Sequence, residues 1–181
     1  MPVLPGDLSA DNFIFEGADD ETGTRGKVNE LGGTDASDTL TGSGGRDSVD
    51  GGAGNDKLIG RADNDVINGG VGRDTLAGNR GDDTLDGGRY SDTLTGGHGD
   101  DVLTGGKWKD TFAFDTGHGD DVITDFEGGM DLIQITASDV GFDDLAIADE
   151  GSAAVVTWDG GSITLEGVDH TALTAEDFVF G

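Results

Sequence analysis

Aspartate recurs every nine residues through the middle of this 181-residue chain. Each of these carboxylates is followed two positions later by an apolar residue, and all but the last are preceded five positions earlier by glycine. The set, whose last member follows a two-residue insertion, is Asp38, Asp47, Asp56, Asp65, Asp74, Asp83, Asp92, Asp101, Asp110 and Asp121. Short carboxylates at this density suit oxygen coordination of a hard cation such as Ca²⁺. Zinc is disfavoured, because the chain has no Cys and only three His.

The nine-residue period also predicts the elements that hold these carboxylates. Positions one to six of each repeat, Gly-Gly-x-Gly-x-Asp, are expected to form a turn, with glycine where φ is positive or backbones approach closely. Positions seven to nine are expected to form a short strand whose middle, apolar residue faces inward. Two repeats then make one coil of eighteen residues, and stacked coils bury the apolar layer. The prediction is an all-β, right-handed parallel β-roll with a C-terminal β-rich cap.

Turns of alternate repeats should lie on opposite edges of the roll. Edge A is defined by the turns 33–38, 51–56, 69–74, 87–92 and 105–110, and edge B by the turns 42–47, 60–65, 78–83, 96–101 and 116–121. Carboxylates along one edge would lie about one strand spacing, roughly 4.8 Å, apart. Like charges that close are costly when ionised. A divalent cation held between stacked turns, by two carboxylates and backbone carbonyls, removes that cost.

The repeat Gly51-Gly-Ala-Gly-Asn-Asp-Lys-Leu-Ile59 resembles the repeat-in-toxin (RTX, hemolysin-type) calcium-binding repeat. The resemblance covers residues 33–124 and implies several bound Ca²⁺ ions. It implies candidate ligands at the ten repeat aspartates, at Asp125, and, for the pair of turns 51–56 and 69–74, at Gly51, Ala53, Asn55, Gly70 and Gly72.

The turns differ in how well they keep the glycines. Those at 51–56, 69–74 and 96–101 match fully, whereas Asp63, Tyr90 and Trp108 replace the fourth-position glycine elsewhere. We expect the tightest sites between Asp56 and Asp74, between Asp83 and Asp101, and between Asp101 and Asp121. Two alternatives remain open: a disordered polar linker, which needs no apolar residue at every ninth place, and a metal-free solenoid with Asn/Asp ladders.

Charge and composition limit the classes of function. The formal net charge is −28, with 31 Asp against 7 Glu, which makes nucleic acid an unfavourable partner. Without Cys, neither disulfides nor thiolate metal sites exist. The N-terminus has no basic and apolar signal-peptide pattern, and no apolar run approaches the length of a membrane span. No catalytic constellation such as His-Glu-x-x-His is present, so we do not expect an enzyme.

The flanks divide the chain into three parts. Residues 1–32 are expected to be an N-terminal lead-in with a capping strand at 11–15 and Leu31 at an inward position. Residues 33–124 form the roll. Residues 125–181 form a cap that resembles the closing segment of serralysin-type proteins, with strands at 131–135, 144–149, 153–158 and 162–166, hairpin turns at 150–151 and 159–161, and a short helix at 171–177.

The last residues, 175–181, resemble the uncleaved C-terminal signal of type I secretion substrates, although an ordinary edge strand would look the same. The expected protein is therefore secreted and extracellular, folds on binding Ca²⁺ outside the cell, and has the type I secretion machinery as a partner. Two alternatives stay open. The chain is the non-catalytic tail of a larger secreted enzyme, such as an alginate epimerase, lipase or protease, or it is an extracellular adhesion module.

Tyr90 and Trp108 occupy the same turn position one coil apart, beside Arg89, Lys107 and Lys109. We expect the two rings to stack. The stack is either a platform for an acidic polysaccharide or an upstream enzyme domain, or a plug on an edge that has lost calcium. His98 and His118 share the third turn position in adjacent coils of edge B, and we expect them to be solvent-facing turn residues.

Overall fold

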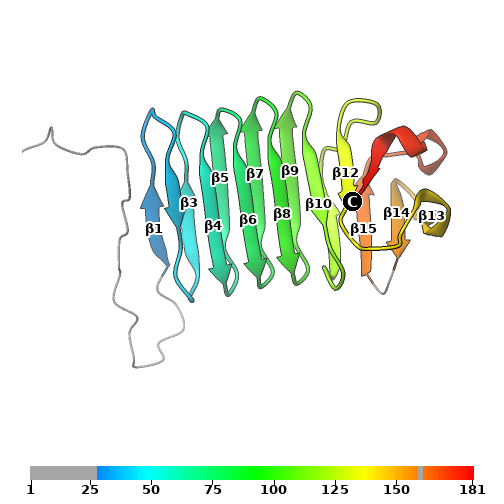
Figure 1. Ribbon diagram of the computed structural model, residues 1–181, viewed down its shortest axis with the longest axis horizontal. Helices are drawn as coiled ribbons and strands as arrows, with labels where there is room; N and C mark the ends of the chain where they lie inside the picture. Colours follow the sequence, from blue (N-terminus) through cyan, green and yellow to red (C-terminus); the bar gives the residue numbers. More distant parts are fainter. Residues whose placement is uncertain (1–27, 159–160) are drawn as a thin grey trace, which may run out of the picture.

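The computed structural model describes residues 28–158 and 161–181. Two facing sheets run the length of the molecule, and successive coils stack along its long axis (Figure 1). The nine-stranded sheet has the order β1 (Asn29–Gly32), β3 (Asp47–Asp50), β5 (Val66–Val71), β7 (Thr84–Arg89), β9 (Val102–Lys107), β11 (Asp120–Ile123), β15 (Gly161–Glu166), β14 (Ala153–Trp158) and β13 (Ala146–Asp149). The seven-stranded sheet has the order β16 (Phe178–Phe180), β12 (Leu132–Ile135), β10 (Thr111–Phe114), β8 (Thr93–His98), β6 (Thr75–Arg80), β4 (Lys57–Ala62) and β2 (Thr39–Thr41).

The register confirms the eighteen-residue coil. Leu58 pairs with Leu76 in one sheet and Ile67 pairs with Leu85 in the other, both in parallel. The interval lengthens to twenty residues where Leu103 pairs with Ile123, because residues 115–119 form a longer connection. The fold is thus a parallel β-roll, as the repeat predicted.

The strands are longer than the sequence analysis predicted. In the middle of the roll each strand has six residues, and it covers positions seven to nine of one repeat and positions one to three of the next. The first-position glycine therefore lies inside the strand and faces inward, two residues after the apolar one, as the alternating burial of β4 shows. The expectation of a six-residue turn and a three-residue strand is wrong, because the first three turn positions also pair in register with the neighbouring coil, as Ala62 does with Arg80.

The core is one layer of side chains between the sheets. The inward residues of the repeats are all buried, from Leu31 and Leu40 through Phe112, which confirms the inward position predicted for Leu31. Each coil buries only a few apolar groups, so its stability depends on the coils stacked against it.

The C-terminal segment continues both sheets. Strand β15 pairs in parallel with β11, and β14 and β13 follow as antiparallel strands. In the other sheet β12 and β16 extend beyond β10. The strands predicted at 131–135, 144–149, 153–158 and 162–166 are confirmed with small changes of boundary, and Gly151, with a φ of 77°, forms the β13–β14 turn.

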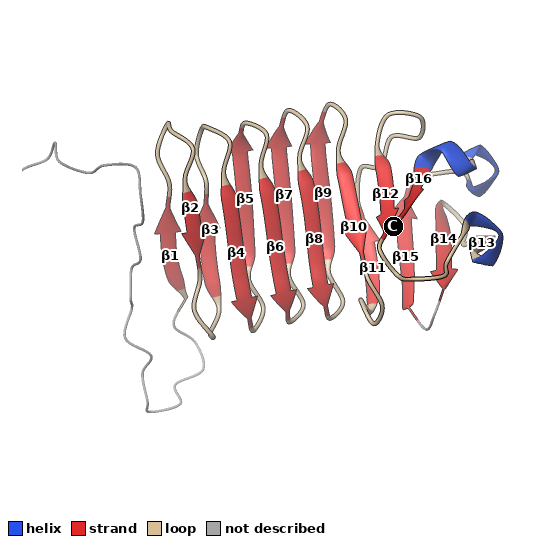
Figure 2. Cartoon of the chain, viewed as in Figure 1, coloured by secondary structure: helices blue, strands red, loops and turns tan. Residues whose placement is uncertain are grey.

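Three short 3₁₀ helices lie at this end: η1 (Phe142–Asp144), η2 (His170–Ala172) and η3 (Ala175–Asp177) (Figure 2). The last two replace the single helix predicted at 171–177, because Asp169 and Thr174 each cap a separate turn. Pairing of β1 with β3 begins within the segment assigned to the lead-in. The predicted capping strand at 11–15 and part of the 159–161 turn lie outside the described residues. No helix among the described residues is long and apolar enough to cross a membrane.

Candidate metal sites

From Asp56 onward, each repeat aspartate is buried and bonds the backbone of the coil before it. Oδ1 of Asp83 accepts the backbone N–H of Asp65 at 2.7 Å, and Oδ1 of Asp74 accepts that of Asp56 at 2.8 Å. The same bond joins every pair of successive aspartates on both edges, from Asp38–Asp56 to Asp101–Asp121. The structure thus brings together on two edges the ten aspartates that the sequence placed there.

The second oxygen of most of these carboxylates has no partner. Seven Oδ2 atoms are buried and unbonded among the described residues: those of Asp56, Asp65, Asp74, Asp83, Asp92, Asp101 and Asp110. Native proteins rarely leave buried polar oxygens unpaired, and such atoms often point to an ion that completes the site. No Lys or Arg of the described part of the chain forms an ion pair with any of them.

Burial raises the pKa of the ladder aspartates that have an orphaned oxygen. It raises the pKa of Asp65, Asp92, Asp101 and Asp110 from 3.8 to about 7, against the opposing effect of the backbone hydrogen bonds that they accept. Burial likewise raises the pKa of Asp56, Asp74 and Asp83. The neighbouring carboxylates of the ladder add to the increase in most cases. The folded roll therefore holds a column of acids that resist ionisation unless positive charge is supplied.

The first-position glycines form a cradle around the orphaned oxygens. A Cβ atom on Gly69 would lie 2.7 Å from Oδ2 of Asp74 and 2.7 Å from the carbonyl oxygen of Gly87. The equivalent point on Gly51 lies 2.5 Å from Oδ2 of Asp56 and 2.7 Å from the carbonyl oxygen of Gly69. A carboxylate oxygen of one coil and a carbonyl oxygen of the next therefore converge. Two carboxylates with backbone carbonyls, all of them hard oxygen donors, fit Ca²⁺.

The aspartate ladders differ from metal sites that are built from three or more acidic or histidine side chains. Within residues 28–158 and 161–181, no three His, Cys, Asp or Glu side chains gather as a metal-binding group. A site here must therefore take much of its coordination from backbone oxygens. Glycine at the second position has a positive φ in the well-formed turns, as in Gly52 at 89° and Gly70 at 93°. This conformation turns the peptide N–H away from the carboxylate.

The first two turns show what happens when the second position has no positive φ. Thr34 and Ser43 occupy the second position there, and their backbone N–H groups donate to Oδ2 of Asp38 and Asp47 at 2.7 and 2.6 Å. The chain itself thus satisfies the oxygens that stay orphaned in the later turns. Asp38 and Asp47 remain predicted ligands, each with one oxygen already bonded.

The other predicted ligands have varied surroundings. The side chain of Asn55 is exposed and accepts the N–H of Arg73 at 2.9 Å, so a contribution to a metal would come from its carbonyl. The carbonyl of Gly51 faces Gly33 of the preceding coil, and that of Gly70 faces Gly88 of the next. Ala53 and Gly72 lie in the stacked turns of edge A. Their role as ligands remains a prediction.

Two aspartates lie at the C-terminal end of the ladders: Asp125, whose role as a ligand remains a prediction, and Asp131, which was not among the predicted ligands. Asp125 binds the N–H groups of Gly105 and Gly106 with its two oxygens, at 2.9 and 2.7 Å, which ties the end of β9 to the loop after β11. Asp131 instead continues the edge A ladder, since its Oδ1 accepts the N–H of Asp110 at 2.9 Å. The sequence analysis missed Asp131, although the apolar residue two positions later, Ile133, carries the same signal as every repeat.

His118 does not face solvent as the sequence analysis expected. It is buried rather than solvent-facing, and its Nδ1 lies 2.6 Å from Oδ2 of Asp121. Its ring stacks on Trp158 at a centroid distance of 4.5 Å. The contact gives the last edge B aspartate the partner that Asp101 lacks, so the predicted site between Asp101 and Asp121 has one fewer free oxygen. His98 is exposed, and its Nδ1 lies 2.8 Å from the carbonyl of Gly117.

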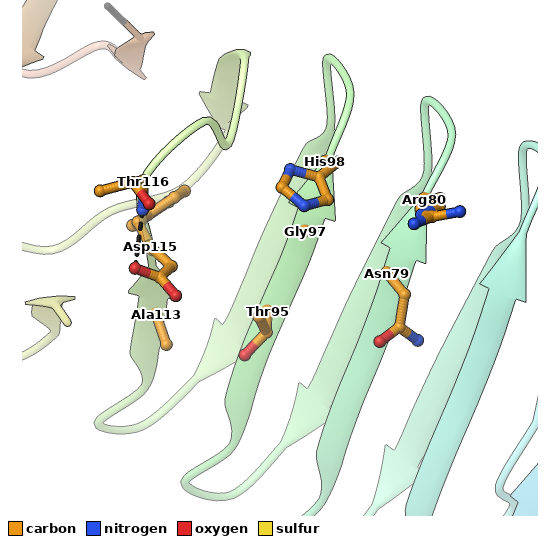
Figure 3. Close-up of a pocket in the computed structure, with 9 residues that line it drawn as sticks. Asn79, Arg80, Thr95, Gly97, His98, Ala113, Asp115 and Thr116 are labelled. Atoms are coloured by element: carbon orange, nitrogen blue, oxygen red, sulfur yellow. Dashed lines mark hydrogen bonds between the residues drawn. The ribbon is translucent and has the colours of Figure 1, made fainter. Parts of the chain in front are cut away.

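A pocket of about 310 Å³ opens beside His98 on edge B, over strands β6, β8 and β10. Arg80 and His98 project from neighbouring turns on one side of it, with Asp115 and Thr116 on the other (Figure 3). Asp115 is the one acid in its lining, and its Oδ1 accepts the N–H of Thr116. The pocket is therefore separate from the buried aspartate ladders.

Comparison with known proteins identifies the repeats. The sequence model of a family described as the RTX calcium-binding nonapeptide repeat matches four overlapping stretches, residues 32–67, 41–76, 52–85 and 77–107. This chain carries RTX calcium-binding nonapeptide repeats. Six of the seven aspartates with an orphaned oxygen lie in the matched stretches, and Asp110 lies just beyond them. No curated protein matches the RTX chain in sequence.

Several solved structures resemble the RTX roll weakly. The extracellular lipase LipA from Serratia marcescens is 17% identical with a TM-score of 0.48, and the match covers 87% of this chain and 40% of the lipase. The R3 and R2 subunits of the AlgE6 mannuronan C5-epimerase from Azotobacter vinelandii are each 25% identical, with TM-scores of 0.36 and 0.35. Those matches cover 81% and 83% of this chain and 80% and 91% of the subunits. All three scores are below 0.5, so no activity or ligand is transferred from these proteins.

Edge A also carries the expected aromatic pair. The rings of Tyr90 and Trp108 stack with centroids 6.0 Å apart and an interplanar angle of 10°. Both backbones have a positive φ, 79° and 89°, which costs about 1–2 kcal/mol for each side chain that is not glycine. An aromatic pair contributes only about 0.5–1.5 kcal/mol beyond burial. Stacking therefore offsets part of the strain at most, and the pair is not explained by stability of the roll alone.

Proposed function

We propose that this RTX chain is a secreted calcium-binding module that folds when Ca²⁺ binds between its stacked turns. The observation that supports it is the set of seven buried, unpartnered Oδ2 atoms, each close to the first-position glycine of its own repeat. Bound Ca²⁺ would supply the positive charge and the coordination that these oxygens lack.

The chain's own residues define the sites. The repeat aspartates hold one oxygen on the backbone of the neighbouring coil and aim the other at the cradle, and the first-position glycines keep that cradle open. The apolar layer closes the interior to water. In a cytosol poor in Ca²⁺, repulsion among the buried acids keeps the chain open for export, and outside the cell metal binding becomes folding free energy.

Circular dichroism and calorimetry test this proposal directly. The purified chain in EGTA should show little β-sheet signal, and addition of millimolar Ca²⁺ should produce the spectrum of a folded roll with several ions bound per chain. Equal β content in EGTA and in Ca²⁺ would refute the coupling. Mg²⁺ at the same concentration is the matched control, because its demand for compact octahedral geometry suits these backbone-rich sites poorly.

We further propose that the C-terminus directs type I secretion to the extracellular space. Residues 175–181 combine acids with a short hydrophobic end, and in the folded chain η3 and β16 form this segment. Expression with a type I export system should place the full chain in the culture medium, and deletion of the last seven residues should retain it in the cell. Export of the deleted chain at an unchanged level contradicts the proposal.

The alternative proposal, that the module is the non-catalytic tail of a larger secreted enzyme, predicts the same response to calcium. It differs in the length of the parent gene and in the presence of a catalytic domain upstream. Sequencing of the complete gene separates the two.

A further inference from the structure

An exposed patch on edge A is chemically unlike the rest of the chain. We define the aromatic–cationic patch as Tyr90, Trp108, Arg89, Lys107 and Lys109, at the ends of β7 and β9. Tyr90 is 49% exposed and Trp108 is 64% exposed. Arg89 and Lys107 are paired in register on adjacent strands, so cations and rings repeat together from one coil to the next.

The cations of the patch are not used by the fold. Among the described residues the ion pairs involve only histidines, and no carboxylate lies within ion-pair distance of Arg89, Lys107 or Lys109. Asp125 lies close to this edge, but its two oxygens bind backbone N–H groups. In a chain with 38 acidic and 10 basic residues, three cations without an ion pair beside two exposed rings are an unusual cluster of positive charge.

We propose that the aromatic–cationic patch binds a polysaccharide that carries carboxylates, such as a chain of uronic acids. The faces of sugar rings present C–H groups that pack on aromatic rings, and the carboxylates of the same sugars pair with Arg and Lys. Complementary charge of this kind fixes the partner and speeds its encounter. The proposal goes beyond calcium-dependent folding and takes from it only the folded roll and its extracellular location.

The surroundings of the patch favour a polysaccharide over a peptide. Peptides commonly bind β proteins by adding a strand to an open sheet edge. Here the turns are already bonded to each other, since Gly72 N–H donates to the carbonyl of Arg89 at 3.1 Å. The outermost strands, β1, β2, β13 and β16, lie at the ends of the sheets. A sugar chain needs no backbone hydrogen bond and can lie across exposed rings.

Charge density favours a polysaccharide over nucleic acid. A single DNA strand carries one phosphate about every 3.4 Å, so it would bring more negative charge against the −28 of the whole chain than a polymer with one carboxylate on each sugar. Bases also stack on aromatic rings, so nucleic acid is included as a competing ligand in the experiment.

The strained backbone provides variants that should keep the fold. Tyr90→Gly and Trp108→Gly restore the residue that stands at this turn position in Gly54 and Gly72, where φ is also positive. Asp63→Gly is the matched control, because Asp63 has a φ of 71° at the same turn position on edge B. Circular dichroism and thermal unfolding in Ca²⁺ verify that all variants fold, which separates this test from failure of the calcium proposal.

Calorimetry of the Ca²⁺-loaded chain then measures binding of a uronic acid hexasaccharide, a neutral hexasaccharide and a six-residue oligothymidylate. We expect the uronate to bind at least tenfold more tightly than the other two, the Tyr90→Gly/Trp108→Gly variant to lose at least tenfold, and Asp63→Gly to stay within twofold. No uronate binding by the unmodified chain, equal loss in Asp63→Gly, or tighter binding of the oligothymidylate overturns the proposal.

The cations are tested separately. Lys107→Gln/Lys109→Gln should weaken uronate binding at least fivefold and reduce its dependence on salt, whereas Arg61→Gln on edge B should do neither. Sedimentation measures whether the patch instead binds a second copy of the chain. Self-association that disappears in Tyr90→Gly/Trp108→Gly, together with absence of uronate binding, overturns the polysaccharide proposal in favour of a dimer.

Discussion

Asp83 bonds Asp65 of the preceding coil with one carboxylate oxygen and leaves the other buried without a partner. The bond from Asp65 N–H to Oδ1 is 2.7 Å long, and Oδ2 has no hydrogen bond among the described residues. The hydrogen bond of Oδ1 therefore stabilises the stack of coils, whereas burial of the unpartnered Oδ2 destabilises it. Which effect dominates depends on whether positive charge reaches Oδ2, and this dependence leads to the following predictions.

Asp74→Asn should have opposite effects with and without calcium. The amide keeps an oxygen for the N–H of Asp56 but removes a buried negative charge whose pKa burial raises. In EGTA at pH 7.5 the variant should therefore be more stable than the unmodified chain. In Ca²⁺ it should be less stable by about 1–3 kcal/mol, since a buried polar pair has lost one partner, and it should bind at least one ion fewer. Circular dichroism measures the β-sheet content in EGTA, urea unfolding measures stability in Ca²⁺, and calorimetry counts the bound ions.

Asp38→Asn is the control for that variant. Oδ2 of Asp38 already accepts the N–H and hydroxyl of Thr34, so the substitution should not stabilise the chain in EGTA. The same gain in both variants would contradict the assignment of Asp74 as an orphaned site.

Gly69→Ala should damage the roll although the backbone of Gly69 needs no positive φ. Its Cβ would lie 2.7 Å from Oδ2 of Asp74 and from the carbonyl of Gly87, closer than atoms normally approach. Overpacking of this kind costs about 1–3 kcal/mol, and it also blocks the cradle. The thermal midpoint in Ca²⁺ should fall, and calcium stoichiometry should decrease.

Gly44→Ala is the matched control, because nothing lies within 4 Å of the position of its Cβ. Its thermal midpoint and stoichiometry should stay close to those of the unmodified chain. A Gly69→Ala variant that behaved in the same way would show that the cradle is not used.

Acid should stabilise the metal-free roll. The pKa values of Asp65, Asp92, Asp101 and Asp110 are about 7 in the folded chain and 3.8 in the reference state. Between these values the folded chain binds more protons than the unfolded chain, so the free energy of unfolding falls as pH rises from about 4 to 7. In EGTA, the β-sheet signal in circular dichroism should be larger at pH 5 than at pH 7.5. A β-sheet signal that is equal or larger at pH 7.5 contradicts the prediction.

Calcium binding should have the reverse dependence on pH, because the carboxylates must lose their protons to bind the ion. The affinity measured by calorimetry should decrease as pH falls from 8 to 6. Affinity that is constant over this range would indicate that the buried acids are not the ligands.

Phe178→Ala should destabilise the C-terminal cap. Phe178 is 5% exposed in β16 and contacts Phe142 and Phe180 with ring centroids 5.4 and 6.3 Å apart. Loss of a buried Phe costs about 3–5 kcal/mol. Its neighbour Val179 is 41% exposed, so Val179→Ala should change stability by less than about 0.5 kcal/mol. Urea unfolding in Ca²⁺ tests the pair, and similar losses in both would contradict the packing described.

The sequence determined the coil of this protein because its signal is local and periodic. Glycine, aspartate and an apolar residue at fixed places in nine positions specify turn, edge and inward face, and Leu58 over Leu76 follows from counting alone. The stacked rings of Tyr90 and Trp108 could be predicted in the same way, since equal positions in successive repeats must meet.

Only the tertiary structure decided which oxygens are left without partners. Asp38 and Asp74 stand at equal positions in the repeat, yet Thr34 satisfies one of them, whereas the other depends on the φ of Gly70 and the coil beyond it. The place of Asp131 in the edge A ladder and the burial of His118 against Trp158 likewise occur where the coil length changes and distant strands β14 and β15 join the sheet. Hydrogen-bond satisfaction depends on every atom around a buried group, and a repeat pattern does not contain that information where the repeat ends.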